Sequence, residues 1–178
     1  VQFDTCASTT SGPSEPLCTR SGDSQISGDL WYRFTAPVGG RTVVSTCGSA
    51  FDTRLGIYAG SCPSGPGSVL ACSDNSCAQQ AQLAFQASAG VPYLIRVGGT
   101  GPARGLGQVV VRCPADFNAD GLLSPADIFA GLNAYFAGDL AADYSGDGIL
   151  APADIFALLN AYFAGCGPTG RTSPKLSK

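Results

Sequence analysis

The sequence predicts a mainly β protein, an antiparallel β-sandwich that is followed by a small α-helical module. Two observations lead to this fold class. Between residues 29 and 113, seven short β-prone runs follow one another, separated by Gly, Pro, Ser or Asn and with no helical pattern between them. Between residues 116 and 165, one pattern is written twice with a period of 27 residues. The 178 residues suffice for one domain with a hydrophobic core and a small appendage.

The first part of the chain divides into a loop-rich segment and the strand runs. Residues 1–28 are rich in Ser, Thr, Gly and Pro and show no hydrophobic period, so we expect loops there. The runs that follow are LWYRFT, RTVVSTC, RLGIY, SVLAC, AQLAFQA, YLIRVG and GQVVVRC. Alternation within two of them predicts strands with one buried face, formed by Leu30, Tyr32 and Phe34 in the first and by Tyr93, Ile95 and Val97 in the second.

Each copy of the repeat opens with the residue spacing of an EF-hand-type calcium loop. Oxygen-bearing side chains stand at positions 1, 3 and 5, a glycine at position 6 and an aspartate at position 12. We therefore predict two calcium ions. The expected ligands are Asp116, Asn118, Asp120, the Leu122 carbonyl, Ser124 or its water and Asp127 in the first loop, and Asp143, Ser145, Asp147, the Ile149 carbonyl and Asp154 in the second. Ala151 offers no side chain at position 9, so the second site should be weaker or more hydrated.

A helix is expected after each loop, with Ser124 as the cap of the first and Pro125 and Pro152 in the first turns. The helices read DIFAGLNAYFA and DIFALLNAYFA and are apolar on nearly every face, which is typical of helices buried all round. The module is too small to cover all of their aromatic side chains, which are Phe129, Tyr135, Phe136, Phe156, Tyr162 and Phe163. Either the sandwich of the same chain covers them or another molecule does.

The net charge of −3 is unevenly placed along the chain. Residues 1–115 carry seven arginines and six acids, residues 116–166 carry seven aspartates and no base, and the tail at 167–178 carries three bases. There is no basic stripe with aromatic residues between the charges, so we expect no nucleic-acid partner. No apolar run approaches about 18 residues, so we expect no membrane span.

The sequence offers little for catalysis. It contains no histidine, no lysine before Lys175, and one glutamate, Glu15, in a loop rich in Pro and Ser. No serine stands in a G-x-S-x-G pattern. We expect a protein that is not an enzyme.

Eight cysteines, with no C-x-x-C pair and no histidine, predict a set of disulfides in an oxidising compartment rather than zinc ligands. Proximity in the sequence favours the pairs Cys6–Cys18, Cys47–Cys62 and Cys72–Cys77, and it leaves Cys113 and Cys166 to bracket the helical module. The chain has no methionine and no leader segment. We therefore expect a mature secreted chain, extracellular or at the cell surface, from which a signal peptide has been removed.

Two places in the β region allow a binding or a structural interpretation. Trp31 with Tyr32 could form a platform that stacks on sugars, but a tryptophan in a strand more often packs against the sheet. Asp74 and Asn75 could hold a further cation, but Asp and Asn are also typical turn residues, here in a turn closed by the expected Cys72–Cys77 disulfide.

Four segments of the β region resemble a bacterial pre-peptidase C-terminal domain. They are D-L-W-Y-R-F at 29–34, S-T-C-G-S-x-F-D-T-R-L-G-I-Y at 45–58, A-C-S-D-N-S-C at 71–77 and Y-L-I-R-V-G-G at 93–99, and the resemblance covers about residues 23–113. Members of that family are jelly-roll-like sandwiches attached to secreted enzymes and surface proteins. The resemblance implies a jelly-roll-like, non-catalytic accessory domain at 29–113 and names no ligand.

Residues 114–166 resemble a dockerin, through aspartate at position 12 of both loops and through two loops about one helix apart. In that family a calcium loop precedes each of two antiparallel helices, and the module docks on a β-sandwich partner called cohesin. Positions 10 and 11, which help to select the partner in many dockerins, are here Pro125 and Ala126 and then Pro152 and Ala153.

Together these observations favour an assembly protein. We expect a non-catalytic, secreted, calcium-binding structural protein whose dockerin-like module docks on the β-sandwich of a neighbouring copy, giving an extracellular filament or tube. The alternative is a targeting or adhesion module that binds a cohesin-like partner or a surface glycan. Assembly predicts concentration-dependent polymers, whereas targeting predicts a missing catalytic partner or an exposed aromatic platform on the sandwich.

Overall fold

The structure is a computed structural model that describes residues 1–37, 39–113, 115–118, 122–144 and 149–165. Its strands are antiparallel and form three sheets. The four-stranded sheet has the order β2 (Ser27–Thr35), β7 (Pro92–Gly99), β4 (Thr53–Ala59), β5 (Val69–Asp74). The three-stranded sheet has the order β6 (Gln82–Ala87), β3 (Gly40–Ser45), β9 (Val110–Arg112), and β1 (Gln2–Asp4) pairs with β8 (Leu106–Gln108).

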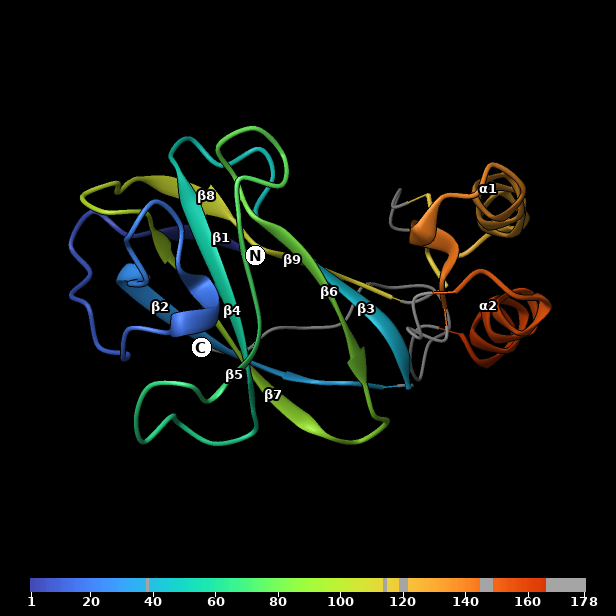
Figure 1. Cartoon of the computed structure of the whole chain (residues 1–178), viewed down its shortest axis with the longest axis horizontal. Helices are drawn as coiled ribbons and strands as arrows, with labels where there is room; N and C mark the ends of the chain where they lie inside the picture. Colours follow the sequence, from blue (N-terminus) through green and yellow to red (C-terminus); the bar gives the residue numbers. More distant parts are fainter. Residues whose placement is uncertain (38, 114, 119–121, 145–148, 166–178) are drawn as a thin grey trace.

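Four helical segments complete the described chain. The short 3-10 turns are η1 (Pro16–Cys18) and η2 (Leu140–Ala142), and the two α-helices are α1 (Pro125–Phe136) and α2 (Pro152–Ala164). In Figure 1 the sheets form the larger body of the molecule, and α1 and α2 lie together at one end of its longest axis.

The four-stranded and three-stranded sheets share one hydrophobic core. Along β2 and β7, Leu30 lies opposite Val97, Tyr32 opposite Ile95 and Phe34 opposite Tyr93, and all six side chains belong to the core or pack against it. The three-stranded sheet contributes Val44, Leu83 and Val111 to the same cluster. The predicted buried faces and the mainly β, antiparallel architecture are therefore confirmed, because alternation places these residues on one side of each pleated strand.

All seven predicted strand runs form strands, with two differences in detail. The last run, GQVVVRC, is divided at Val109 into β8 and β9, which pair with different partners, β1 and β3. Strand β1 lies in the segment that we expected to be loop-rich. Its three residues are too few to show an alternation that a sequence pattern could detect.

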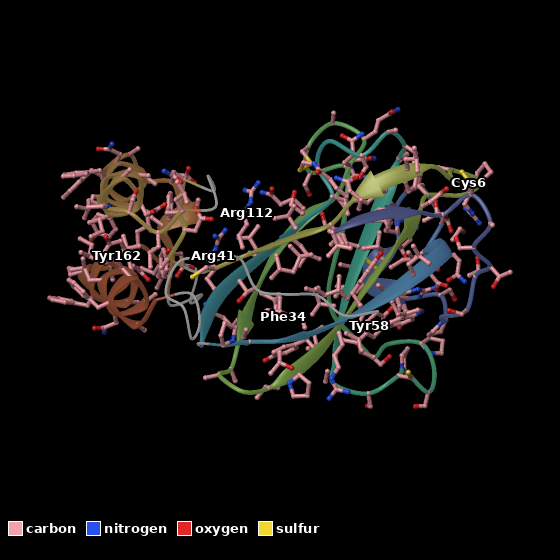
Figure 2. All side chains as sticks on the ribbon, turned by 180° about the vertical axis from the view of Figure 1, so that it is seen from behind. Cys6, Phe34, Arg41, Tyr58, Arg112 and Tyr162 are labelled. Carbon is pink, nitrogen blue, oxygen red and sulfur yellow. A yellow bond between two sulfur atoms is a disulfide. The ribbon has the colours of Figure 1, made fainter. Side chains whose placement is uncertain are left out.

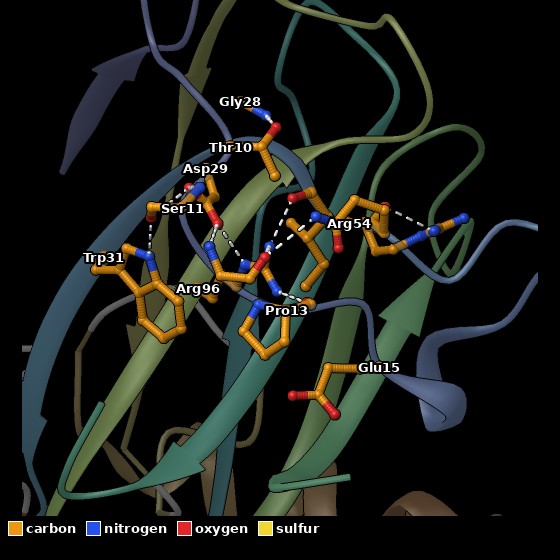
Figure 3. A network of polar contacts seen from close by, with 12 residues as sticks. Thr10, Ser11, Pro13, Glu15, Gly28, Asp29, Trp31, Arg54 and Arg96 are labelled. Carbon is orange, nitrogen blue, oxygen red and sulfur yellow. Dashed lines mark hydrogen bonds and ion pairs between the residues drawn. The ribbon is translucent and has the colours of Figure 1, made fainter. Parts of the chain in front are cut away.

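Arg96 on β7 anchors the N-terminal segment to the outer face of the four-stranded sheet (Figure 3). Its side chain is fully buried, and its Nε donates to the carboxylate of Asp29 at 2.6 Å. Asp29 also accepts from the backbone N–H groups of Ser11 and Gly12, at 2.8 Å each. Burial alone would raise the pKa of Asp29, but the hydrogen bonds from Ser11 and Gly12 and the charge of Arg96 hold it below its ordinary value. Arg96 further donates to the carbonyl oxygens of Gly12, Pro13 and Ile26.

Trp31 is part of this structural network. Its ring centroid lies 5.1 Å from that of Tyr58 and 5.4 Å from the guanidinium carbon of Arg96, and its Nε1 donates to the Ser11 hydroxyl at 3.0 Å. Tyr32 points to the other face and lies in the core. The two residues therefore form no shared platform for a sugar, and the packing interpretation is confirmed.

Asp74 likewise has a structural partner. Arg54 on β4 is fully buried, and its Nη2 donates to Asp74 at 2.8 Å, while its Nη1 donates to the backbone carbonyls of Asp23 and Gln25. The next residue, Asn75, has a left-handed backbone with φ of 58°, which asparagine tolerates in turns. Asp74 therefore forms a structural ion pair with Arg54 at the end of β5.

The disulfides differ from the predicted pairs. Cys18 is joined to Cys72 and Cys47 to Cys77, whereas Cys6 and Cys62 are exposed free thiols. The predictions Cys6–Cys18, Cys47–Cys62 and Cys72–Cys77 are therefore wrong, because η1 packs on β5 and brings together cysteines that are 54 residues apart. Cys113 is disulfide-bonded, and Cys166, its expected partner, lies outside the described residues.

Candidate metal centre

In the first loop, Asp127 at position 12 closes the loop upon itself. Its carboxylate is fully buried and accepts hydrogen bonds from the backbone N–H groups of Asn118, at 3.2 Å, and Ser124, at 2.8 Å. These donors are positions 3 and 9, so one side chain ties both halves of the loop together. The Ser124 hydroxyl accepts from the N–H of Ala126 at 3.3 Å, and Ser124 and Asp127 form a capping box at the start of α1, so the predicted cap is confirmed.

The second loop repeats part of this arrangement. Asp154 is 1% exposed and accepts from the N–H of Ala151 at 2.8 Å, the counterpart of the bond between Asp127 and Ser124. Ala151 has no oxygen in its side chain, so α2 begins without a side-chain cap. The predicted ligands Asp120, Ser145 and Asp147 lie outside the described residues. Leu122 and Ile149, whose carbonyl oxygens are the other predicted ligands, have exposed side chains.

The donor set fits calcium by its chemistry. The four aspartates at positions 1 and 12, Asp116, Asp127, Asp143 and Asp154, are all at most 9% exposed, and residues 116–166 contain no basic residue. Buried carboxylates are unfavourable unless a cation or hydrogen bonds compensate them. Oxygen ligands without histidine suit Ca²⁺ rather than Zn²⁺. No group of three or more acidic or cysteine side chains within the described ranges is arranged to hold a metal, so the two calcium sites stay a prediction.

The helices contact each other at the one position where their sequences differ. Residues 125–137 and 152–164 are identical except that Gly131 of α1 corresponds to Leu158 of α2. A Cβ atom on Gly131 would lie 2.4 Å from Cδ2 of Leu158, and Leu158 is 3% exposed. One small and one large residue therefore fill a contact that two leucines would overfill.

We expect Gly131→Leu to lower the free energy of unfolding of the helix pair by about 1–3 kcal/mol, because overfilling a packed contact strains it. The exchange Gly131→Leu with Leu158→Gly should recover most of this loss, since it restores one leucine and one glycine. Thermal unfolding followed by circular dichroism at helical wavelengths measures both variants. Equal stability of the single variant and the unchanged chain would show that the contact is not tight.

Tyr144 connects the helical module to the sandwich. It follows Asp143, is 5% exposed, and its backbone carbonyl accepts from Nε2 of Gln86 on β6 at 3.1 Å. Its ring stacks on Phe117, the equivalent residue of the first loop, with centroids 6.2 Å apart. Burial raises the pKa of the Tyr144 phenol, the charge of Arg41 opposes the rise, and Asp127 and Asp116 add to it. Tyr144 of the second loop therefore contacts the sheet directly, and Phe117 of the first loop contacts Tyr144.

Two arginines of the three-stranded sheet face the acidic module. Arg41 on β3 and Arg112 on β9 share the outer face of the sheet with Val43, which lies opposite Arg112, and Figure 2 shows both between the sheet and the helices. Both line a cavity of about 150 Å³ together with Asp116, and Arg41 lines a second one of about 290 Å³ with Asp143. The sandwich thus supplies positive charge next to a module that has none of its own.

The sandwich does not cover the phenylalanines of the helices. Figure 2 shows side chains of α1 and α2 that project away from the sandwich at this end of the molecule. Tyr135 and Tyr162 are half-buried, and Tyr162 packs beside Cys113 and Ala115. The four phenylalanines, in contrast, are 66–80% exposed, and we name them the phenylalanine stripes: Phe129 and Phe136 on α1, Phe156 and Phe163 on α2. The interpretation that the chain's own sandwich covers them is wrong.

The exposed side of each helix carries no charge. Besides the phenylalanines, the exposed residues of the two helices are Pro125, Ala126, Asn133, Pro152, Ala153, Asn160 and Ala164. The one charged residue in each helix, Asp127 or Asp154, is buried. Residues seven apart on a helix lie on one side, so each stripe spans two turns. Exposed apolar surface of this kind is typical of a protein interaction site.

No described helix is both long and apolar enough to cross a membrane. Comparison with models of known protein families and with curated protein sequences returns no match. The similarity of residues 23–113 to pre-peptidase C-terminal domains, and of residues 114–166 to dockerins, therefore stays a prediction.

Proposed function

We propose that this protein is a non-catalytic, secreted structural protein that binds two calcium ions and assembles with itself. The helical module of one copy, residues 114–166, docks its phenylalanine stripes on the β-sandwich of the next copy. The observation that carries this proposal is the exposure of Phe129, Phe136, Phe156 and Phe163, which reaches 78% and 80% in the second residue of each stripe. Leaving so much aromatic surface in water is unfavourable unless a partner covers it.

Contact between a module and a sandwich joins two different surfaces, so it is heterologous. Repeated from copy to copy, such a contact gives a closed ring or an open filament or tube. The charges are compatible with the pairing, because the module is acidic and Arg20 and Arg33 of the sandwich are exposed. Calcium, held by the ligands predicted above, would keep the module folded and its stripes in place.

We expect the double variant Phe136→Ser/Phe163→Ser to stay monomeric in calcium at concentrations where the unchanged chain forms polymers. Both residues are so exposed that the fold does not depend on them. Leu140→Ser is the matched control, because Leu140 is 60% exposed but lies on η2, outside both the stripes and the sandwich. Sedimentation velocity and electron microscopy measure the outcome. Only monomers of the unchanged chain at every concentration, or polymers of the double variant, would disprove the proposal.

The same stripes also fit the alternative function, attachment to a β-sandwich of another protein. In that case the chain alone stays monomeric in calcium, while the stripes remain necessary for capture of the foreign domain. The glycan version of this alternative lacks support at Trp31, whose indole packs against Tyr58 and hydrogen-bonds to Ser11.

A further inference from the structure

The three-stranded sheet presents two arginines, Arg41 and Arg112, to the predicted calcium loops. Both are half-buried, and Figure 2 shows them between the sheet and the helices. Arg112 lies opposite Val43, which is two residues from Arg41, so the two side chains are diagonal neighbours on one face of the sheet. A partly buried charge is costly unless an opposite charge or hydrogen bonds compensate it. The ion pairs among the described residues are those of Arg54 and Arg96, so the charges of Arg41 and Arg112 require a different compensation.

The acidic residues that share cavities with these arginines are the first residues of the two loops. Arg41 and Arg112 line the cavity of about 150 Å³ together with Asp116, and Arg41 lines the cavity of about 290 Å³ together with Asp143. Asp116 and Asp143 occupy equivalent positions of the repeat and are 7% and 9% exposed. Arg41 therefore lies beside both loops, whereas Arg112 lies beside the first loop.

Bound calcium would leave a negative charge on each loop. Each predicted loop contains three aspartates, so a Ca²⁺ ion changes its charge from −3 to −1. Residues 116–166 contain no basic residue that could offset this remainder. Arg41 and Arg112 together carry +2, which equals the sum of the two remaining charges. Attraction between partly buried charges is stronger than attraction between charges in water.

We propose that Arg41 and Arg112 are positioning residues that couple calcium binding to the seating of the helical module on its own sandwich. This inference rests on the proposed function, because it requires the two predicted calcium sites. The calcium-loaded, folded module gains the attraction of both arginines, and the calcium-free module, which we expect to unfold, does not. The arginines therefore strengthen calcium binding in the whole chain. Because such coupling is reciprocal, calcium holds the module against the sandwich with its phenylalanine stripes pointing outwards.

The first test measures calcium binding to the full chain by isothermal titration calorimetry. In Arg41→Gln/Arg112→Gln we expect the Kd for calcium to rise about tenfold, about threefold for each arginine. The rise should shrink at high salt, because salt screens charges that are only partly buried. Arg41→Lys/Arg112→Lys keeps both charges and should bind calcium like the unchanged chain. Circular dichroism in saturating calcium checks that each variant is folded.

The matched control is Arg33→Gln, which removes the same charge from an exposed position on β2 of the other sheet. It should leave the Kd for calcium nearly unchanged. If Arg33→Gln weakens binding as much as Arg112→Gln, net charge alone acts and the inference fails.

The second test assigns each arginine to a loop. In the background Asp154→Asn the first site dominates the titration, and in Asp127→Asn the second site does. Arg41→Gln should weaken calcium binding in both backgrounds, because Arg41 lies beside both loops. Arg112→Gln should weaken it with Asp154→Asn and leave it unchanged with Asp127→Asn.

Three results would overturn the inference. The first is an unchanged Kd in Arg41→Gln/Arg112→Gln, and the second is the reverse loop assignment of Arg112. The third is tighter calcium binding in the double variant, which would mean that the arginines compete with calcium for the aspartates. If the unchanged chain binds no calcium at all, the proposed function fails instead, so the two failures are distinguishable.

Discussion

Chelation of calcium is expected to unfold the helical module while the sandwich stays folded. Each predicted loop contains three aspartates, and residues 116–166 contain no base, so each calcium-free loop carries a charge of −3. Two of these carboxylates, Asp127 and Asp154, are almost completely buried. Without a cation, the carboxylates of each loop repel one another, and the buried ones have little water to solvate them. The closed loops are then no longer stabilised.

The expected effect is large. At a calcium concentration of about one thousand times Kd, each site stabilises the folded module by about 4.1 kcal/mol. The helices α1 and α2 have 12 and 13 residues, so their loss should remove most of the helical circular dichroism signal and leave the β signal. Isothermal titration calorimetry should find two calcium ions per chain, the second bound more weakly because Ala151 replaces the serine at position 9.

Single substitutions separate the loops from the rest of the module. Asp127→Asn and Asp154→Asn should each weaken one predicted calcium site, because each removes the charge of a predicted ligand. Asp139→Asn is the control: Asp139 is exposed, lies between the loops, and accepts from the N–H of Ala141, a bond that asparagine can also accept. A helical signal that chelator leaves unchanged, or fewer than two bound ions, would contradict the prediction.

The strands could be predicted because the alternation of buried and exposed residues is visible within each short segment of sequence. Tyr32 and Phe34 alternate with exposed or half-buried neighbours, and this alternation alone places them in the core. The exposed stripes could also be foreseen in part, because the helices are more apolar than a small module can bury. Which side of the helices stays exposed depends on how the module sits on the sandwich, and a sequence pattern carries no such information.

The disulfides could not be predicted for a related reason. Proximity in the sequence favours a pairing only because a short loop costs less entropy to close. The pairing of Cys18 with Cys72 follows instead from the packing of η1 on β5. In the same way, Arg96 was not identified as a structural residue. Arginine in a strand normally indicates a solvent-facing position, and the burial of Arg96 requires the N-terminal segment to fold over the sheet and present its carbonyl groups and Asp29.

Replacement of Arg96 by methionine is expected to lower the free energy of unfolding of the sandwich by about 3–5 kcal/mol. This is the usual effect of removing one partner from a buried ion pair, because the other charge stays buried without compensation. Asp29 is 5% exposed, and in the variant it would keep its contacts with Ser11 but lose Arg96. The N-terminal segment would also lose the hydrogen bonds from Arg96 to Gly12, Pro13 and Ile26.

Arg33→Met on β2 is the matched control, because Arg33 is exposed and exposed substitutions usually change stability by at most about 0.5 kcal/mol. Denaturant unfolding in calcium measures both variants. In a double-mutant cycle, Asp29→Asn together with Arg96→Met should cost less than the sum of the single changes, since the asparagine leaves no buried charge behind. Additive effects, or an Arg96→Met variant as stable as Arg33→Met, would mean that this ion pair does not anchor the N-terminal segment on the four-stranded sheet.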